Sequence, residues 1–156
     1  MLRLTIPGRS ELYVENVVFD FNGTLATDGK LSPSVREKIA RLKAELNVFI
    51  LSSDTYGTVA KECRDLGVSV STLSGEHCST QKKNFVSALG PEKTICIGNG
   101  ANDIGMFQVC ALSIIIIGAE GCSAKALVEA DIAVRDVEEA LDLLFNPKRI
   151  TATLRE

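Results

Sequence analysis

The chain has 156 residues, of which 46% are hydrophobic and 24% are charged. This length corresponds to one domain of ordinary size, and this composition excludes wholesale disorder and low complexity. The formal charge is −3, from 17 Lys and Arg against 20 Asp and Glu, so neither a broad polyanion-binding surface nor nucleic acid as a partner is expected.

Export and membrane insertion are not expected either. The opening segment, MLRLTIPGRSELY, lacks an apolar core of signal-peptide length. The longest strongly apolar run, 114–117 with its flanks, is far shorter than the ~20 residues of a spanning helix. The five cysteines are odd in number and show no C-x-x-C spacing, which predicts unpaired thiols in a reducing, cytoplasmic compartment.

Strand and helix patterns alternate along the chain. Runs that are apolar on both faces are typical of strands buried in a parallel sheet, and apolar residues three or four apart predict the helices between them. Ser32 followed by Pro33 is a typical helix start. In chain order we expect strand 14–21, helix 33–46, strand 47–53, helix 55–66, strand 68–73, helix 79–89, strand 93–99, helix 101–110, strand 112–118, helix 123–130, strand 132–135 and helix 137–144.

This alternation predicts the α/β class: one doubly wound, Rossmann-like parallel sheet flanked by helices, with no second domain in 1–156. We expect an edge strand or hairpin in 1–13 and a C-terminal tail in 147–156. Ligands of such sheets bind at the carboxyl ends of the strands, where the strand order reverses. Four polar clusters of this chain fall at strand ends or helix starts in the right region to share one site.

The first two clusters follow two of the predicted strands. In Asp20-Phe21-Asn22-Gly23-Thr24-Leu25 a carboxylate leaves the strand end and glycine permits a tight turn around whatever the carboxylate holds. An ordinary Asn-Gly turn explains this segment equally well when it is taken alone. Ser52-Ser53-Asp54 follows the next strand, and by itself it is typical of a helix N-cap.

The other two clusters lie at helix starts. Adjacent lysines, as in Gln81-Lys82-Lys83, usually form a solvated face. Gly98-Asn99-Gly100-Ala101-Asn102-Asp103 combines glycines, which allow close backbone approach, with a helix N-terminus, which favours an anion. His77, the only histidine, lacks the other ligands of a metal site and is expected in a loop.

Taken together and in this order, the clusters resemble the four motifs of the haloacid dehalogenase (HAD) superfamily of phosphotransferases. DFNGTL is similar to D-x-D-G-T-L except at its third position, and GNGAND to G-D-G-x-N-D except at its second. SSD and Lys82 match the second and third motifs, and the resemblance spans about 14–144. The chain is most similar to the catalytic core of P-type ATPases and their soluble relatives. The segments 24–33 and 54–82 are too short for a cap domain of the usual size.

The resemblance implies a mechanism and a set of site residues. Asp20 would attack phosphorus to form an aspartyl-phosphate, Ser52 would hydrogen-bond a phosphoryl oxygen, and Lys82 would balance negative charge. With Asn22 these form the expected catalytic set. The expected phosphate-binding residues are Asp20, Gly23, Thr24, Ser52, Ser53, Lys82 and Asn102. The expected ligands of a Mg²⁺ cofactor are Asp20, Asn22 through its backbone carbonyl, Asn99 and Asp103.

Two departures from the motifs leave two functions open. Asn22 stands where the family has an aspartate that exchanges a proton, a contribution typically of 10²–10⁴-fold, and Asn99 stands where it has a metal-binding carboxylate. One reading is a slow Mg²⁺-dependent phosphatase acting on small phosphorylated substrates, including acyl phosphates. The alternative is a module that binds phosphate or holds a phosphoryl group as a switch without turnover. Because a capless site is open to water, we also expect a homo-oligomer.

Overall fold

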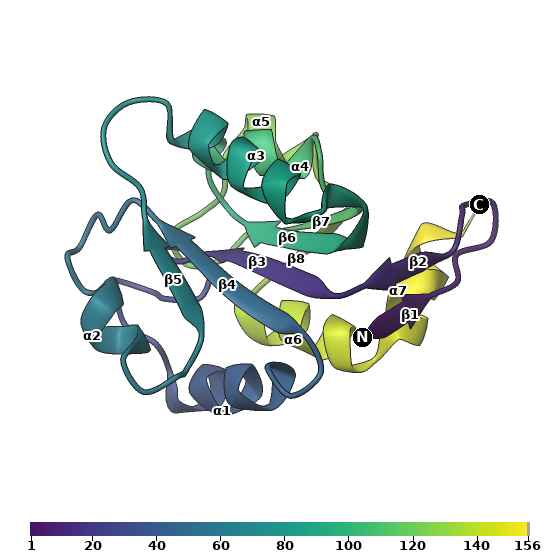
Figure 1. Cartoon of the computed structure of the whole chain (residues 1–156), viewed down its shortest axis with the longest axis horizontal. Helices are drawn as coiled ribbons and strands as arrows, with labels where there is room; N and C mark the ends of the chain where they lie inside the picture. The colour runs from purple at the N-terminus through teal and green to yellow at the C-terminus, as the bar shows by residue number, and fades with distance from the viewer. Residues whose placement is uncertain (156) are drawn as a thin grey trace.

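The computed structural model describes residues 1–155, and its centre is a six-stranded sheet in which every neighbouring pair is parallel. The strand order is β5-β4-β3-β6-β7-β8 (Figure 1). The strands are β3 (Asn16–Asp20), β4 (Asn47–Ser52), β5 (Ser69–Thr72), β6 (Thr94–Gly98), β7 (Leu112–Ile116) and β8 (Ile132–Val134). The chain moves outward from β3 in one direction and then in the other, so the order reverses at β3. This is the predicted doubly wound α/β fold, with the Asp20 strand at the switch point.

Helices cover both faces of the sheet (Figure 1). The helices are α1 (Pro33–Leu42), α2 (Val59–Cys63), α3 (Cys78–Leu89), α4 (Ile104–Phe107), α5 (Ala124–Leu127), α6 (Val137–Phe145) and α7 (Pro147–Leu154), with 3₁₀ turns η1 (Pro91–Lys93) and η2 (Ala101–Asp103). One face packs on α1, α2 and α6 and the other on α3, α4 and α5, which produces two separate hydrophobic clusters. None of the helices in the described part of the chain has the length and apolarity needed to cross a bilayer.

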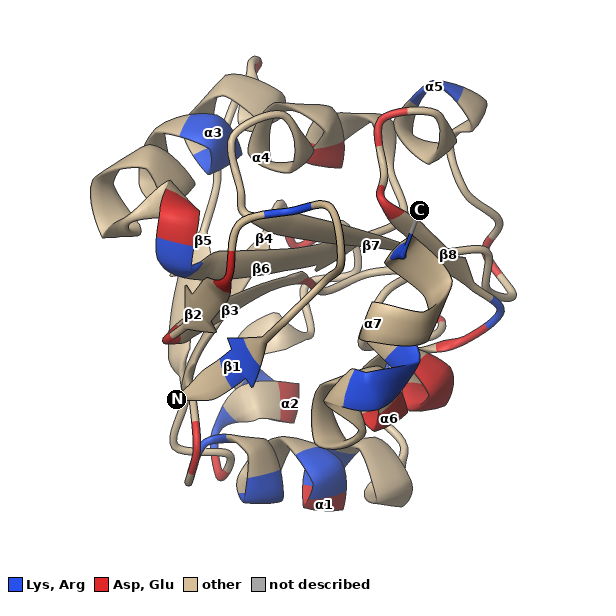
Figure 2. Cartoon of the chain, turned by 90° about the vertical axis from the view of Figure 1, so that its right-hand side faces the viewer, with Lys and Arg blue, Asp and Glu red and all other residues tan. Residues whose placement is uncertain are grey.

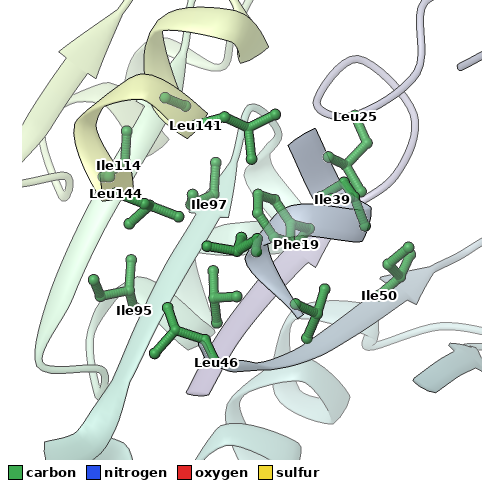
Figure 3. Packing of buried hydrophobic residues seen from close by; sticks show 14 of the residues in the cluster. Phe19, Leu25, Ile39, Leu46, Ile50, Ile95, Ile97, Ile114, Leu141 and Leu144 are labelled. Carbon is green, nitrogen blue, oxygen red and sulfur yellow. The ribbon is translucent and has the colours of Figure 1, made fainter. Parts of the chain in front are cut away.

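The apolar clusters explain why the central strands read as continuous hydrophobic runs. Along β3, Val17 and Phe19 belong to the cluster under α1 and α6, whereas Val18 belongs to the cluster under α3 and α4. Successive side chains of a strand point to opposite faces, so a strand covered on both sides has no polar face. Figure 3 shows Phe19 among Ile39, Ile97 and other aliphatic side chains of the first cluster.

Both ends of the chain pack at one edge of the molecule. In the segment 1–13, for which an edge strand or hairpin was expected, β1 (Leu2–Leu4) pairs antiparallel with β2 (Leu12–Val14). The segment 147–156, interpreted from sequence as a tail, contains helix α7, whose Ile150 is fully buried. Pro147 at the helix start and the burial of one apolar stripe explain why this short segment is helical.

Four predicted helices are shorter than expected, and the first of them, 33–46, ends at Leu42 in α1. Helix 55–66 is reduced to α2 because Asp54 and Gly57 have positive φ, and residues between them form a turn that the Asp54 carboxylate closes by accepting from Thr58 N and Val59 N. Helices 101–110 and 123–130 are reduced to η2 with α4 and to α5. Between β3 and α1, and between β4 and α3, the described residues form only turns, α2 and β5, so no cap domain is present there.

Candidate active site

A buried ion cluster lies at the carboxyl end of β3. The Lys82 Nζ donates to Asp20 Oδ1 at 2.5 Å and to Asp103 Oδ1 at 2.7 Å. Lys82 and Asp103 are fully buried and Asp20 is 5% exposed. The three side chains come from α3, from the end of β3 and from the loop after β6, so they meet only because β3 and β6 are neighbours and α3 covers that face. Lys82 is thus an interior residue, unlike the solvated face that adjacent lysines usually form.

The loop after β6 holds Asp103 in place. The Asp103 Oδ2 accepts from the backbone N–H of Asn99 at 2.9 Å and from that of Gly100 at 2.8 Å. A Cβ on Gly98 would overlap the Asp103 carboxylate, so glycine is required there for the loop to close on its own aspartate. Backbone donors and Lys82 therefore hold both oxygens of this carboxylate, which fixes its orientation.

A second set of contacts connects the loop after β3 to the loop after β6. The Thr24 hydroxyl lies 3.3 Å from Asp20 Oδ2 and 3.2 Å from Asn99 Oδ1. Gly23 has φ +75°, and a Cβ there would overlap the Asn99 side chain. The side-chain oxygen Oδ1 of Asn22 is buried without a hydrogen-bond partner among the described residues. The predicted Asn22 and Asn99 therefore both lie beside Asp20.

The predicted serines after β4 lie in different environments. Ser52 is 1% exposed, and its Oγ accepts from Asp54 N at 2.8 Å, which leaves its hydroxyl proton free to donate. Ser53 is exposed and lines a pocket with Asp20. Asp54 does not enter the ion cluster, because its carboxylate caps α2.

Burial controls the protonation of the ion cluster. Burial, and next the negative charge of Asp103, raise the pKa of Asp20 to about 7, although Lys82 opposes the shift. Burial by itself lowers the pKa of Lys82, but the carboxylates of Asp103 and Asp20 raise it by more, so the net direction is upward. Two carboxylates around one ammonium leave the cluster one negative charge in excess. The site therefore has an affinity for a cation or a proton.

A pocket of about 220 Å³ opens over this cluster. Its lining residues are Asp20, Asn22, Ser53, Thr55, Tyr56, Asn99, Gly100, Asn102 and Glu120. Of the predicted phosphate-binding residues, Asp20, Ser53 and Asn102 line it and Lys82 is buried beneath it. Gly23, Thr24 and Ser52 are not among its lining residues. A larger hollow, of about 400 Å³, lies at the opposite, amino ends of β4 and β5; it includes no carboxylate, so the smaller pocket is the candidate site.

Thr55, Tyr56 and Glu120 line the pocket but were not predicted from the sequence. Tyr56 lies in the turn that replaces the start of the predicted helix. Glu120 lies four residues after the end of β7, and its position after a buried strand is a signal that could have identified it. Its Oε1 accepts from the backbone N–H of Asp28 at 2.8 Å, and so it joins the loops after β7 and β3.

The donor atoms around the pocket fit a hard cation. Asp20 and Asp103 offer carboxylate oxygens, Asn99 offers an amide oxygen, and the unpartnered Asn22 Oδ1 is an acceptor in need of a positive partner. Mg²⁺ prefers such oxygen ligands and retains several waters. In the described part of the chain, no three His, Cys, Asp or Glu side chains come together as a metal-binding group. A cation would therefore be held by two carboxylates and by neutral oxygens.

Comparisons with known proteins agree with the motifs. The chain is 29% identical over 137 residues to the "Soluble P-type ATPase-like phosphatase" of Methanocaldococcus jannaschii, a match that covers 86% of this chain and 50% of that protein. It is also 45% identical over 65 residues to the uncharacterized protein MJ0073 of the same organism, which covers 42% of this chain and 70% of that one. No family model matches the chain.

Solved structures show the same fold. A putative HAD family hydrolase from Streptomyces avermitilis superposes with a TM-score of 0.70 at 21% identity and covers 93% of this chain and 90% of its own. The cobalt-bound deoxy-D-mannose-octulosonate 8-phosphate phosphatase of Haemophilus influenzae has a TM-score of 0.67 at 18% identity, with 92% and 94% covered. In its four motifs, its fold and its curated relative, the chain is similar to members of the HAD superfamily.

That curated relative is a soluble P-type-ATPase-like phosphatase, and this chain has no cap domain within its described residues. The chain spans half the length of the phosphatase that it matches in Methanocaldococcus jannaschii.

Proposed function

We propose that the chain is a Mg²⁺-dependent phosphohydrolase that cleaves phosphoric monoesters or acyl phosphates through an aspartyl-phosphate on Asp20. The observation that carries the proposal is the Lys82 ammonium held between Asp20 and Asp103 at the floor of the pocket. The HAD motifs and the curated relative support the same reaction class.

The roles of the residues follow from their positions. Lys82 contacts Asp20 Oδ1, whereas Oδ2 accepts from the Thr24 hydroxyl, so Oδ2 is the oxygen we expect to attack phosphorus. Lys82 fixes the Asp20 carboxylate and compensates charge at the floor, and the Ser52 hydroxyl has a proton to donate to a phosphoryl oxygen. Asn102 and the backbone of Gly100 line the wall that would contact the phosphoryl group. Positioning and charge compensation supply most of the catalysis in phosphoryl transfer.

Mg²⁺ would be held by Asp20, Asp103, Asn99 and an oxygen of Asn22, and it would supply the positive charge that this net-negative cluster needs to accept a phosphate dianion. The buried, unpartnered Asn22 Oδ1 is one candidate contact, and the Asn22 backbone carbonyl is the other. Because Asn99 is neutral, we expect weaker binding than a site with a third carboxylate would give.

Slow turnover is part of the proposal. Asn22 cannot exchange a proton near neutral pH, so neither the leaving group nor the hydrolytic water receives acid-base help from this position. Substrates with good leaving groups, such as acyl phosphates, depend least on that help. A second candidate is a module that binds phosphate or retains the phosphoryl group, which the neutral side chains at positions 22 and 99 favour.

The open pocket and the cysteines support two further parts of the proposal. Tyr56 at the pocket mouth is 47% exposed, and no cap domain covers it within the described residues, so we propose that a neighbouring copy closes the site in a homo-oligomer. The five cysteines form no disulfide, which fits a cytoplasmic location.

The test is a panel of p-nitrophenyl phosphate, acetyl phosphate and alkyl phosphates with and without Mg²⁺. The expected result is Mg²⁺-dependent phosphate release, fastest with acetyl phosphate, that Asp20→Asn abolishes and the exposed control Asp65→Asn retains. Mass spectrometry after acetyl phosphate treatment should locate an adduct on Asp20. Tight phosphate binding with no release and no adduct would favour the binding module instead.

A further inference from the structure

The walls of the pocket differ in charge from its floor. Of the nine lining residues, none is Lys or Arg, and the only charged side chain apart from Asp20 is Glu120. Lys82, which is completely buried, is already shared between two carboxylates and cannot pair with a second anionic group of a substrate. The remaining wall side chains, including Ser53, Thr55 and Asn102, offer hydroxyl and amide groups.

The structure fixes Glu120 at the rim of the pocket. The loop that contains it contacts the loop after β6 on its far side, where Gly121 O accepts from Asn99 Nδ2 at 3.1 Å and Ser123 N donates to Asn99 O at 2.8 Å. The same loop also lies close to the loop after β3, because a Cβ added to Gly118 would be 3.8 Å from Gly23 O. The hydrogen bond from Asp28 N to Glu120 Oε1 then orients the side chain itself. Glu120 is exposed, and the hydrogen bond from Asp28 N holds its carboxylate at the rim of the pocket.

We propose that this site takes monophosphate esters of small uncharged or amine-bearing alcohols and rejects those with a second anionic group, and that Glu120 carries the rejection. The inference rests on the proposed function and names its substrate class. A hydroxyl-bearing leaving group is matched by the hydroxyl and amide groups of the wall and by the half-exposed ring of Tyr56. A carboxylate there would meet Glu120 with no Lys or Arg of the wall to compensate, so specificity comes from a repulsive element.

The size of the pocket restricts the class further. A volume of about 220 Å³ accommodates a phosphoryl group and a leaving group of a few heavy atoms. Glycerol 3-phosphate and 3-phosphoglycerate are suitable probes, since they differ only by a hydroxymethyl group and a carboxylate. Phosphoethanolamine carries an ammonium at the corresponding distance. Together the three probes vary charge at nearly constant size.

The experiment measures kcat/KM for the three esters with saturating Mg²⁺. We expect glycerol 3-phosphate and phosphoethanolamine to exceed 3-phosphoglycerate by at least about tenfold, the size of a like-charge interaction a few ångströms apart in a partly screened site. Glu120→Gln keeps an oxygen that accepts from Asp28 N but removes the charge, so it should reduce the ratio to about threefold or less. The exposed Glu129→Gln should leave the ratio unchanged.

The outcomes separate the inference from the proposed function. Turnover of p-nitrophenyl phosphate together with equal or faster cleavage of 3-phosphoglycerate overturns the inference alone, as does an unchanged ratio in Glu120→Gln. If neither acetyl phosphate nor p-nitrophenyl phosphate is cleaved, the proposed function fails, and calorimetric Kd values of the same esters with Mg²⁺ then decide the inference. The same order of affinities supports it, and no binding or the reverse order overturns it.

Discussion

Two clusters among the described residues each hold one lysine between two carboxylates, and the pKa shifts of their carboxyl groups are opposite in direction. Lys82 with Asp20 and Asp103 is buried under the active-site pocket. Lys38 of α1, with Glu138 and Asp142 of α6, lies at the surface with side chains 25%, 36% and 42% exposed. Figure 2 shows α1 and α6 near each other on the outside of the molecule, with basic and acidic residues on them.

The pKa shifts of Glu138 at the surface and Asp20 in the interior have opposite directions. The hydrogen bond from Lys38 lowers the pKa of Glu138, which is the ordinary effect of an ion pair in water. Burial raises the pKa of Asp20 to about 7 although Lys82 touches it. At the surface, this arrangement of charges stabilises the pairing of α1 and α6. In the interior, the same arrangement holds an excess negative charge that does not stabilise the folded state. Such a charge favours the binding of a cation, which would in turn attract an anionic group.

The largest expected effect comes from removing the buried lysine. Lys82→Met leaves two carboxylates buried without a cation, so unfolding should be easier by about 3–5 kcal/mol at pH 8. Urea denaturation of the metal-free protein measures this change. Acidification to pH 5 should recover part of the loss, since Asp20 takes up a proton more easily than an ordinary aspartate. A loss of less than about 1 kcal/mol in the free energy of unfolding at pH 8 would contradict the claim that Lys82 compensates two buried negative charges.

The pH dependence of stability tests the raised pKa of Asp20. Because the folded chain retains this proton up to about pH 7 and the unfolded chain loses it near pH 4, the folded state binds more protons between these values. The stability of the metal-free protein should therefore fall as the pH rises through this window, by at most about 1.4 kcal/mol per pH unit from this group. Asp20→Asn should remove this fall, and at pH 8 it should be as stable as the parent or more so.

Restoring carboxylates at positions 22 and 99 should increase the activity of the buried site, a change that has no counterpart at the surface cluster. The double variant Asn22→Asp, Asn99→Asp regains a proton-exchanging group and a metal carboxylate, and should hydrolyse p-nitrophenyl phosphate at least about tenfold faster. Its half-saturating Mg²⁺ concentration should fall. Both residues precede glycine, so intact-mass measurement must exclude deamidation in the parent. A folded, Mg²⁺-binding but inactive double variant would favour the binding module.

The smallest effect is expected at the surface cluster. Lys38→Met removes an exposed cation between two exposed carboxylates, and should cost between 0 and about 1 kcal/mol, less in 0.5 M NaCl than at low salt. Urea denaturation at the two salt concentrations measures it. A loss as large as that of Lys82→Met would mean that burial is not what distinguishes the two clusters.

Local patterns in the sequence determined much of this protein. Alternating apolar runs and helical spacings identified the six sheet strands and the helices between them, because side-chain burial has a period that differs between strand and helix. The resemblance of its motifs to those of the HAD superfamily indicated Asp20, Lys82 and Asp103 as site residues, and the structure brings them together. The sequence pattern misjudged the start of α2, where the carboxylate of Asp54 closes a turn, and the segment that contains α7.

The tertiary structure alone decided how these residues interact. No local pattern shows that Lys82 is completely buried, that it contacts both aspartates, or that Asn22 Oδ1 has no partner in the described chain, because these facts depend on which strands are neighbours and which helix covers them. Glu120 and Tyr56 reach the pocket for the same reason, since their loops follow strands that are distant from β3 in sequence but end at the same edge of the sheet. The periodicity of a sequence predicts which side chains are buried. Which charged side chains meet at one point depends on the order of the strands in the sheet, which periodicity does not predict.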